Sequence, residues 1–340
     1  MTKLVSAFLI SVLCTGCFGG VRPMMVNVLD KRAEHPATYN GMPLRSGQLV
    51  LTESPDSTSF AFFLIPEKFY PFTHIAILSI ENGEPWVYDV TGEVATIPLK
   101  KRLLDNVSGH MYRRPFFEYV AANLYAEVYD PPADAQPEAI AAFARRKYEQ
   151  GVKFDTHFDS KENSTLYCSE LVSLAIRAAG GTPPPLERSS ANPSIVKTMQ
   201  WLDVPPGEAL PAGAFMDPTR YVAALGQFAN RTAAWSYLEA KREIFRRFAV
   251  DQRLGYVLAL SNNGELTVRP QISEFAFEAA KLFQGAAEQP SPGDPRIAAA
   301  VRSLADKVFG PFGEPPAAPS TPRADDTATP TAPTPAAPPQ

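Results

Sequence analysis

An Asn-Gly pair at positions 82 and 83 constrains the fold of this chain more than any other short segment. It separates two segments rich in β-branched or aromatic residues, Thr73–Ile80 and Trp86–Val90, which predict two strands. Asn-Gly favours a type I′ turn, the tight connection between antiparallel strands. The sequence therefore predicts a β-hairpin whose register is set at the turn, with Glu81 facing Glu84.

The register of this hairpin decides which polar side chains meet. Counting back from the turn places Ala76 opposite Asp89 and His74 opposite Thr91. His74 and Asp89 are then diagonal neighbours on one face, roughly 7–8 Å apart, which a ring side chain can span. A carboxylate can accept a hydrogen bond from one imidazole nitrogen while the other nitrogen faces a nucleophile. A slip of one residue would send Asp89 to the opposite face, so this pairing depends on the turn.

The segment Leu166–Ala179 carries the clearest helix signal in the chain, and two glycines at 180 and 181 end it. One face is apolar at helical spacing, and its members are Cys168, Leu171, Val172, Ala175, Ile176 and Ala179. Cys168 therefore points inward from the first turn, where we expect Ser164 or Thr165 to cap the helix. First-turn amides and the helix dipole stabilise a thiolate there and can receive an oxyanion. A buried cysteine that only fills space is the alternative.

The chain has four histidines, at positions 35, 74, 110 and 157. Only His74 lies inside an apolar strand that brings a carboxylate to its own face. A histidine in a core is usually structural, but this carboxylate and the inward cysteine favour a catalytic role. His157 is the nearest alternative partner for Cys168 in the sequence.

The N-terminus is typical of an exported protein. Lys3 precedes the apolar run Leu4–Leu13, which is too short to span a bilayer but suits a secretory signal. The segment Cys14–Cys17 that follows is similar to a bacterial lipoprotein processing site, although Cys14 stands where leucine is usual. We expect a signal peptide at 1–16, a lipid on Cys17 and a tether at 17–40, and a plain secretion signal is the alternative.

Of the three cysteines in the chain, Cys14 would leave with the signal and Cys17 would be acylated. Cys168 would then be the only free thiol of the mature protein. In an oxidising compartment a lone thiol risks oxidation, so a functional reason for it is expected.

Composition limits the remaining possibilities. Apolar residues make up 45% of the chain and charged residues 20%, with a net charge of −4, so we expect a soluble globular protein that does not bind nucleic acid. Helices are predicted at Pro115–Tyr129, Pro137–Tyr148, Tyr221–Phe248, Ser273–Phe283 and Asp294–Val308. We expect one domain at 41–217, a helical extension at 218–313 and a disordered tail at 314–340, where Pro, Ala and Thr dominate.

Several of these segments together resemble the YiiX-like hydrolases, a circularly permuted papain-fold branch related to the NlpC-type cell-wall hydrolases. The resemblance covers roughly Gly41–Pro184 and is carried by Leu44–Thr52, Thr73–Ile77, Trp86–Val90, Phe154–Asp155, Phe158 and Leu166–Val172. It implies an α+β, permuted papain-like domain in which an antiparallel sheet packs on the cysteine helix. The histidine strand precedes the cysteine helix in that family, as it does here.

The resemblance also implies roles for individual residues. Cys168 matches the nucleophile and His74 the base. Asp89 matches a third polar residue that is often glutamate in this branch. Gln48 stands where an aspartate is common, at a position that we do not expect to be catalytic. Apart from the resemblance, Tyr167 is a candidate oxyanion donor through its hydroxyl, and simple packing of its ring is the interpretation that we slightly prefer.

These features predict an exported cysteine hydrolase that works through an acyl-enzyme and needs no cofactor. We expect no metal, since Asp155, His157 and Asp159 alternate in a polar loop that suits solvation. An amide of a peptidoglycan peptide is the first expected substrate. A lipid ester or amide, hydrolysed or transferred, is the second, because Phe60–Ile65 and Phe69–Phe72 could line an apolar entrance. A non-catalytic envelope binding module is the third possibility.

The expected location is the periplasmic side of a bacterial membrane, with a lipid anchor at Cys17 and the outer membrane preferred to the inner one.

Overall fold

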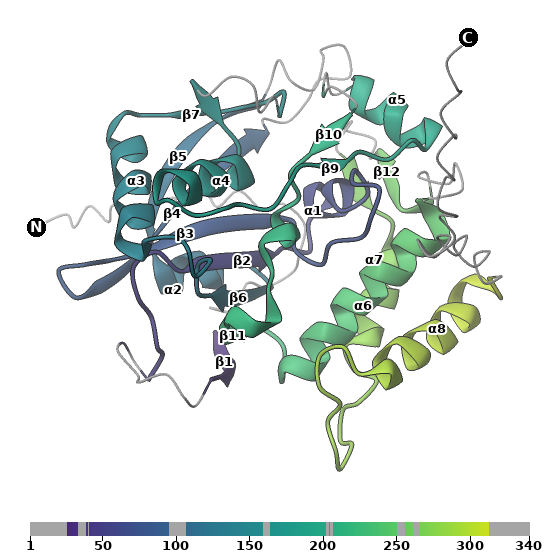
Figure 1. Cartoon of the computed structure of the whole chain (residues 1–340). Coiled ribbons are helices and arrows are strands. Elements are labelled where there is room, and N and C mark those ends of the chain that lie inside the picture. Colours follow the sequence, from purple (N-terminus) through teal and green to yellow (C-terminus); the bar gives the residue numbers. More distant parts are fainter. Residues whose placement is uncertain are drawn as a thin grey trace, which may run out of the picture.

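The computed structural model describes residues 26–32, 39, 41–94, 107–158, 164–201, 204, 207–249, 256–260 and 266–312. The predicted signal peptide, Cys17, His35, Asp159 and the tail at 314–340 lie outside these residues. The described chain has an α+β fold built on one large mixed sheet with helices on both sides (Figure 1).

Nine strands of the described chain form the main sheet. Their spatial order is β1 (Asn27–Lys31), β11 (Tyr221–Gly226), β6 (Tyr125–Tyr129), β2 (Leu49–Glu53), β3 (His74–Glu81), β4 (Glu84–Val94), β5 (Val107–Pro115), β7 (Lys153–Phe154) and β8 (Thr165–Leu166). Neighbouring strands are antiparallel except β7 and β8, which are parallel. Two small sheets pair β9 (Glu187–Arg188) with β10 (Glu208–Ala209) and β12 (Leu258–Leu260) with β13 (Leu266–Val268).

Helices cover both faces of the sheet and one of its ends (Figure 1). They are α1 (Ser57–Phe62), α2 (Phe116–Ala121), α3 (Pro137–Glu149), α4 (Cys168–Ala178), α5 (Pro193–Trp201), α6 (Arg231–Phe248), α7 (Pro270–Ala279) and α8 (Pro295–Phe309), with 3-10 turns at Ala212–Phe215 and Pro218–Arg220. Helices α3 and α4 pack on each other and on β3, whereas α6, α7 and α8 pack together.

The two faces of the sheet bury separate apolar clusters, because successive strand residues point to opposite faces. Ile75 and Ile77 belong to the larger cluster, which includes the apolar side chains of α3 and α4. Ala76 and Leu78 belong to a smaller cluster under α2. The central strands are therefore apolar on both faces, and a strand of this kind has no alternating pattern.

This lack of a pattern explains why the start of one predicted helix is a strand. Tyr221–Phe248 was expected to be a single helix, but its first six residues form β11, which lies between β1 and β6. Every residue of β11 is buried, so the segment is uniformly apolar and was not distinguishable from a buried helix. Helix α6 begins only at Arg231, where the Asn230 side chain accepts a hydrogen bond from the Ala233 amide.

The segment predicted as a helix at Pro115–Tyr129 is also divided. Helix α2 ends at Ala121, and the fully buried strand β6 follows at Tyr125–Tyr129. In contrast, the helix predicted at Pro137–Tyr148 is confirmed as α3, which begins with proline at its first position.

Within the expected tether at 17–40, Asn27–Lys31 forms the edge strand β1, which pairs with β11.

Candidate active site

The hairpin predicted around residues 82 and 83 is confirmed. Asn82 and Gly83 both have positive φ, 52° and 83°, as a type I′ turn requires. The pairs of β3 and β4 run from Glu81 with Glu84 to Ile77 with Tyr88, which is the register expected from the sequence.

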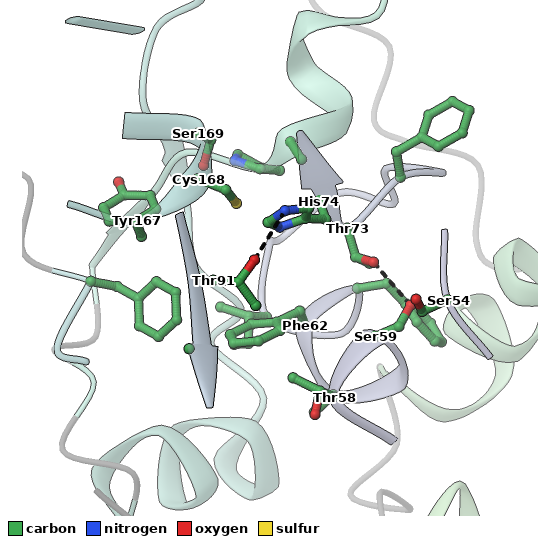
Figure 2. A pocket seen from close by; sticks show the side chains of 18 of the residues that line it. Ser54, Thr58, Ser59, Phe62, Thr73, His74, Thr91, Tyr167, Cys168 and Ser169 are labelled. Carbon is green, nitrogen blue, oxygen red and sulfur yellow. Dashed lines mark hydrogen bonds between the residues drawn. The ribbon is translucent and has the colours of Figure 1, made fainter. Parts of the chain in front are cut away.

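His74 is the first residue of β3, a central strand of the sheet, and lies beside Cys168 (Figure 2). Cys168 is the first residue of α4, and its side chain points toward the His74 ring. The backbone amide of Ile75 donates a hydrogen bond to the sulfur. The helix N-terminus and the first residues of β3 thus hold the thiol beside the imidazole.

The His74–Asp89 contact predicted from the hairpin register is present. His74 Nε2 lies 3.3 Å from Asp89 Oδ2, and the carboxylate is buried, with 1% of its side chain exposed. Thr91 Oγ1 donates to the same oxygen at 2.5 Å, and the Arg114 guanidinium lies 3.4 Å from it. Because Nε2 is on the Asp89 side, Nδ1 is the nitrogen left to face Cys168.

The electrostatics of the pair favour a thiolate and an imidazolium. Burial by itself raises the pKa of the Cys168 thiol, but the His74 cation and the amides of Ile75 and Ser169 lower it below its ordinary value. Burial alone would lower the pKa of His74, but the Cys168 thiolate and the Asp89 carboxylate raise it to about 10. The two groups titrate as one coupled unit, in which each charge stabilises the other.

The helix cap differs from the expected one. Neither Ser164 nor Thr165 is the N-cap of α4, which is Tyr167, and no side chain accepts a capping hydrogen bond there. The reason is that Thr165 and Leu166 form strand β8, which pairs with β7 and carries the chain directly into the helix. At this helix end, the backbone amide of Ser169 donates a hydrogen bond to the Cys168 sulfur.

Tyr167 lies on the other side of Cys168 from His74 in Figure 2. Its ring centroid is 5.3 Å from that of Phe158, so the side chain packs in an aromatic group. Its role as an oxyanion donor stays a prediction.

The other polar candidates lie away from this contact. Gln48 binds Asp130 Oδ1 and the Pro43 carbonyl at the start of β2. Asp155 Oδ1 accepts from the His157 amide, and the His157 side chain is exposed. Among the described residues, no three histidine, cysteine, aspartate or glutamate side chains are grouped to hold a metal ion. No helix in the described ranges is long and apolar enough to cross a membrane.

The structure adds three residues to the site that the sequence did not indicate. Thr91 and Arg114 contact Asp89, and the Tyr119 ring on α2 lies 6.4 Å from the His74 ring. The hairpin register places Thr91 opposite His74, so its position at the site could have been predicted from the sequence. Arg114 and Tyr119 reach the site only because β5 pairs with β4 and continues directly into α2.

Cys168 and His74 open into a cavity of about 700 Å3. Its walls include parts of α1, β3, β4, α2 and α5, the residues at 154–158 and 167–169, and the segment at 208–212. Figure 2 shows some of the side chains that line it. The cavity is of the size that holds small ligands in proteins, and the thiol lies on its wall.

No protein-family model matches the chain, and no curated protein matches it. Among solved structures, the chain is similar to one described as metalloprotein yiiX from Escherichia coli O157:H7, DUF1105, with 16% sequence identity and a TM-score of 0.41. The alignment covers 53% of this chain and 95% of that chain.

The lowered thiol pKa leads to a prediction about the pH dependence of alkylation. Since thiolate is the reactive form, Cys168 should react with iodoacetamide at neutral pH faster than an ordinary thiol, whose pKa is about 8.5. The rate should fall only as the pH drops through the lowered thiol pKa. Mass spectrometry of the peptide that contains Cys168 measures it separately from Cys14 and Cys17.

The control for this measurement is His74→Ala, which removes the cation. Its alkylation profile should move up in pH, toward that of the urea-unfolded chain. Identical profiles for the folded and unfolded wild-type protein would contradict the assignment of a stabilised thiolate.

Proposed function

We propose that this protein is an exported cysteine hydrolase that cleaves an amide or ester through an acyl-enzyme on Cys168. The observation that carries this proposal is the chain of contacts from Cys168 through His74 to Asp89. A nucleophile, a base and a group that orients the base form the minimal set for acyl transfer.

In this mechanism the Cys168 thiolate attacks the substrate carbonyl carbon and forms a carbon–sulfur bond. The carbonyl oxygen becomes an oxyanion, which first-turn amides of α4 stabilise, with the Tyr167 hydroxyl as a further proposed donor. The bond to the leaving nitrogen or oxygen then breaks, and the His74 imidazolium protonates that atom. His74 then takes a proton from a water molecule whose oxygen attacks the acyl carbon. The carbon–sulfur bond breaks, the acid leaves, and the Cys168 thiolate and His74 imidazolium are restored. Asp89 orients the ring and stabilises its cation throughout.

The proposed fold is the permuted papain-like one, related to that of NlpC-type hydrolases. It is supported by the order of the chain, in which the histidine strand precedes the cysteine helix, and by the position of Cys168 at the helix N-terminus. The sheet and the helix that carry the two residues belong to one apolar core.

Two substrate classes are candidates for this site. A peptidoglycan peptide amide suits an exported protein with the family resemblance described above. A lipid ester or amide, hydrolysed or transferred to an acceptor, is favoured by the apolar lining of the cavity. The competing non-catalytic function, an envelope binding module, would not require the paired shifts in the pKa values of Cys168 and His74.

We also propose that residues 1–16 direct export and that Cys17 carries a lipid anchor. The catalytic domain would then lie on the periplasmic side of a bacterial membrane, preferably the outer one. The proposal rests on the sequence, since these residues lie outside the described ranges.

The test of the proposed reaction uses p-nitrophenyl acetate, whose acyl group is too small to need a binding pocket. We expect a burst of about one nitrophenolate per chain, followed by slower turnover, and an acetyl group on Cys168 in rapidly quenched samples. Cys168→Ala should show neither. Equal nitrophenolate release by wild type and Cys168→Ala would overturn the proposed function.

A further inference from the structure

The cavity beside Cys168 has mostly apolar walls. The side chains that form them include Phe62, Ile65, Phe72, Phe158, Met199 and Leu210. We propose that this cavity holds the hydrocarbon chain of an acyl substrate, so that the substrate is a fatty acyl ester or amide. This inference rests on the proposed function, since the chain would belong to the acyl group transferred to Cys168.

A continuous aromatic wall leads from α1 to the nucleophile. The Phe62 and Phe158 ring centroids are 5.1 Å apart, and the Phe158 and Tyr167 centroids are 5.3 Å apart. Tyr167 immediately precedes Cys168, and Phe154 adds a further ring at 5.7 Å from Phe158. An acyl group bonded to the sulfur would therefore enter apolar surroundings from its first carbons.

The charged groups of the cavity also favour an uncharged acyl chain. Two of them are acids, Asp56 and Glu208, besides the catalytic Asp89. The cations in the lining are His74 and Arg114, and both already contact Asp89. A peptide with free carboxylates would meet further negative charge and would lose solvation without a new cationic partner.

One group of polar residues in the lining lies around the start of α1. Ser54, Ser59 and Thr73 belong to this group, and Ser59 Oγ lies 2.9 Å from Thr73 Oγ1 (Figure 2). Ser59 Oγ also donates to the buried carboxylate of Glu53. The hydroxyls of Ser59 and Thr73 are thus engaged within the protein, which leaves the burial of apolar surface as the main source of affinity.

A series of p-nitrophenyl esters from acetyl to octanoyl, at concentrations below micelle formation, tests this inference. Because a buried methylene favours binding by up to about fourfold, kcat/KM should rise steadily with chain length. We expect octanoyl to exceed acetyl by at least about tenfold. If kcat/KM stays constant along the series while the acetyl ester still shows its burst, the acyl-chain inference is overturned and the proposed function stands. If no ester shows a burst, the proposed function itself is overturned.

Two matched variants locate the effect in the cavity. Phe62→Glu places a charge in the apolar wall and should lower the octanoyl-to-acetyl ratio about tenfold or more. The control is Phe117→Glu, since Phe117 is also partly buried but lies within α2, beside Tyr39, and does not line the cavity. It should keep the wild-type ratio.

An unchanged ratio in Phe62→Glu would show that the chain lies elsewhere and would overturn the inference. Preferred turnover of short peptide p-nitroanilides over the octanoyl ester would also overturn it, because the cavity would then hold peptide side chains.

Discussion

Replacing Cys168 by alanine is expected to abolish turnover of any ester or amide substrate, with a loss of about 10⁴-fold or more. The variant has no nucleophile to form the acyl-enzyme, and the remaining base can only act on water. His74→Ala should cause a loss of similar size, because it removes both the cation that stabilises the thiolate and the acid for the leaving group. The double variant should be no worse than either single variant, since the two residues act as a unit.

Asp89→Asn should cause a smaller loss than His74→Ala, because it keeps the size of the side chain and removes only its negative charge. The measurement is kcat/KM for one activated ester, with thermal melting to confirm that each variant folds.

His110→Ala is the matched control for His74→Ala. His110 is exposed on β5 beside Tyr112 and lies outside the cavity lining, so its loss should leave the rate unchanged. Full activity of His74→Ala would contradict the assignment of the base.

The second large effect is expected on stability, at a buried ion pair next to the site. Lys241 on α6 contacts Glu53 at the end of β2, and both side chains are fully buried. Burial lowers the pKa of the Lys241 ammonium and raises that of the Glu53 carboxyl, while each partner opposes the shift of the other. Removing one partner leaves the other without compensation, so Lys241→Met should reduce the free energy of unfolding by about 3–5 kcal/mol.

Two comparisons separate this effect from the loss of a lysine in general. Lys281→Met removes an exposed pair with Glu278 and should change the free energy of unfolding by less than about 1 kcal/mol. Adding Glu53→Gln to Lys241→Met should recover part of the lost stability, because the uncompensated acid is gone. Urea unfolding gives the free energy of unfolding of each of these variants. A Lys241→Met protein as stable as the wild type would contradict the prediction.

The Lys241 network also explains how segments far apart in the sequence are held together at the site. Lys241 Nζ donates to Ser59 Oγ at 3.0 Å, and Ser59 in turn contacts Thr73, the residue before His74. Helix α6 therefore supports the start of β3, although it follows the cysteine helix by more than fifty residues. From the sequence, this helix was expected to belong to the extension at 218–313, with no connection to the site.

The contact between His74 and Asp89 could be predicted from the sequence because the features that set it are local. A two-residue turn sets the register of the hairpin, and register decides which side chains share a face. The amphipathic pattern of α4 likewise placed Cys168 on its inward side. Each of these features depends on residues within about twenty positions of one another.

The larger sheet was decided only by tertiary structure. Strands β6 and β11 are buried on both faces, so their sequences show neither the alternation of a strand nor the period of a helix. Whether such a segment becomes a strand depends on partners that satisfy its backbone hydrogen bonds, and these partners come from distant parts of the chain. The sequence by itself determined the hairpin, the cysteine helix and the identity of the paired residues. The tertiary structure decided the order of the sheet, the contacts of Arg114 and Tyr119 with the site and the apolar cavity, because these arise from side chains that meet only when distant segments pack.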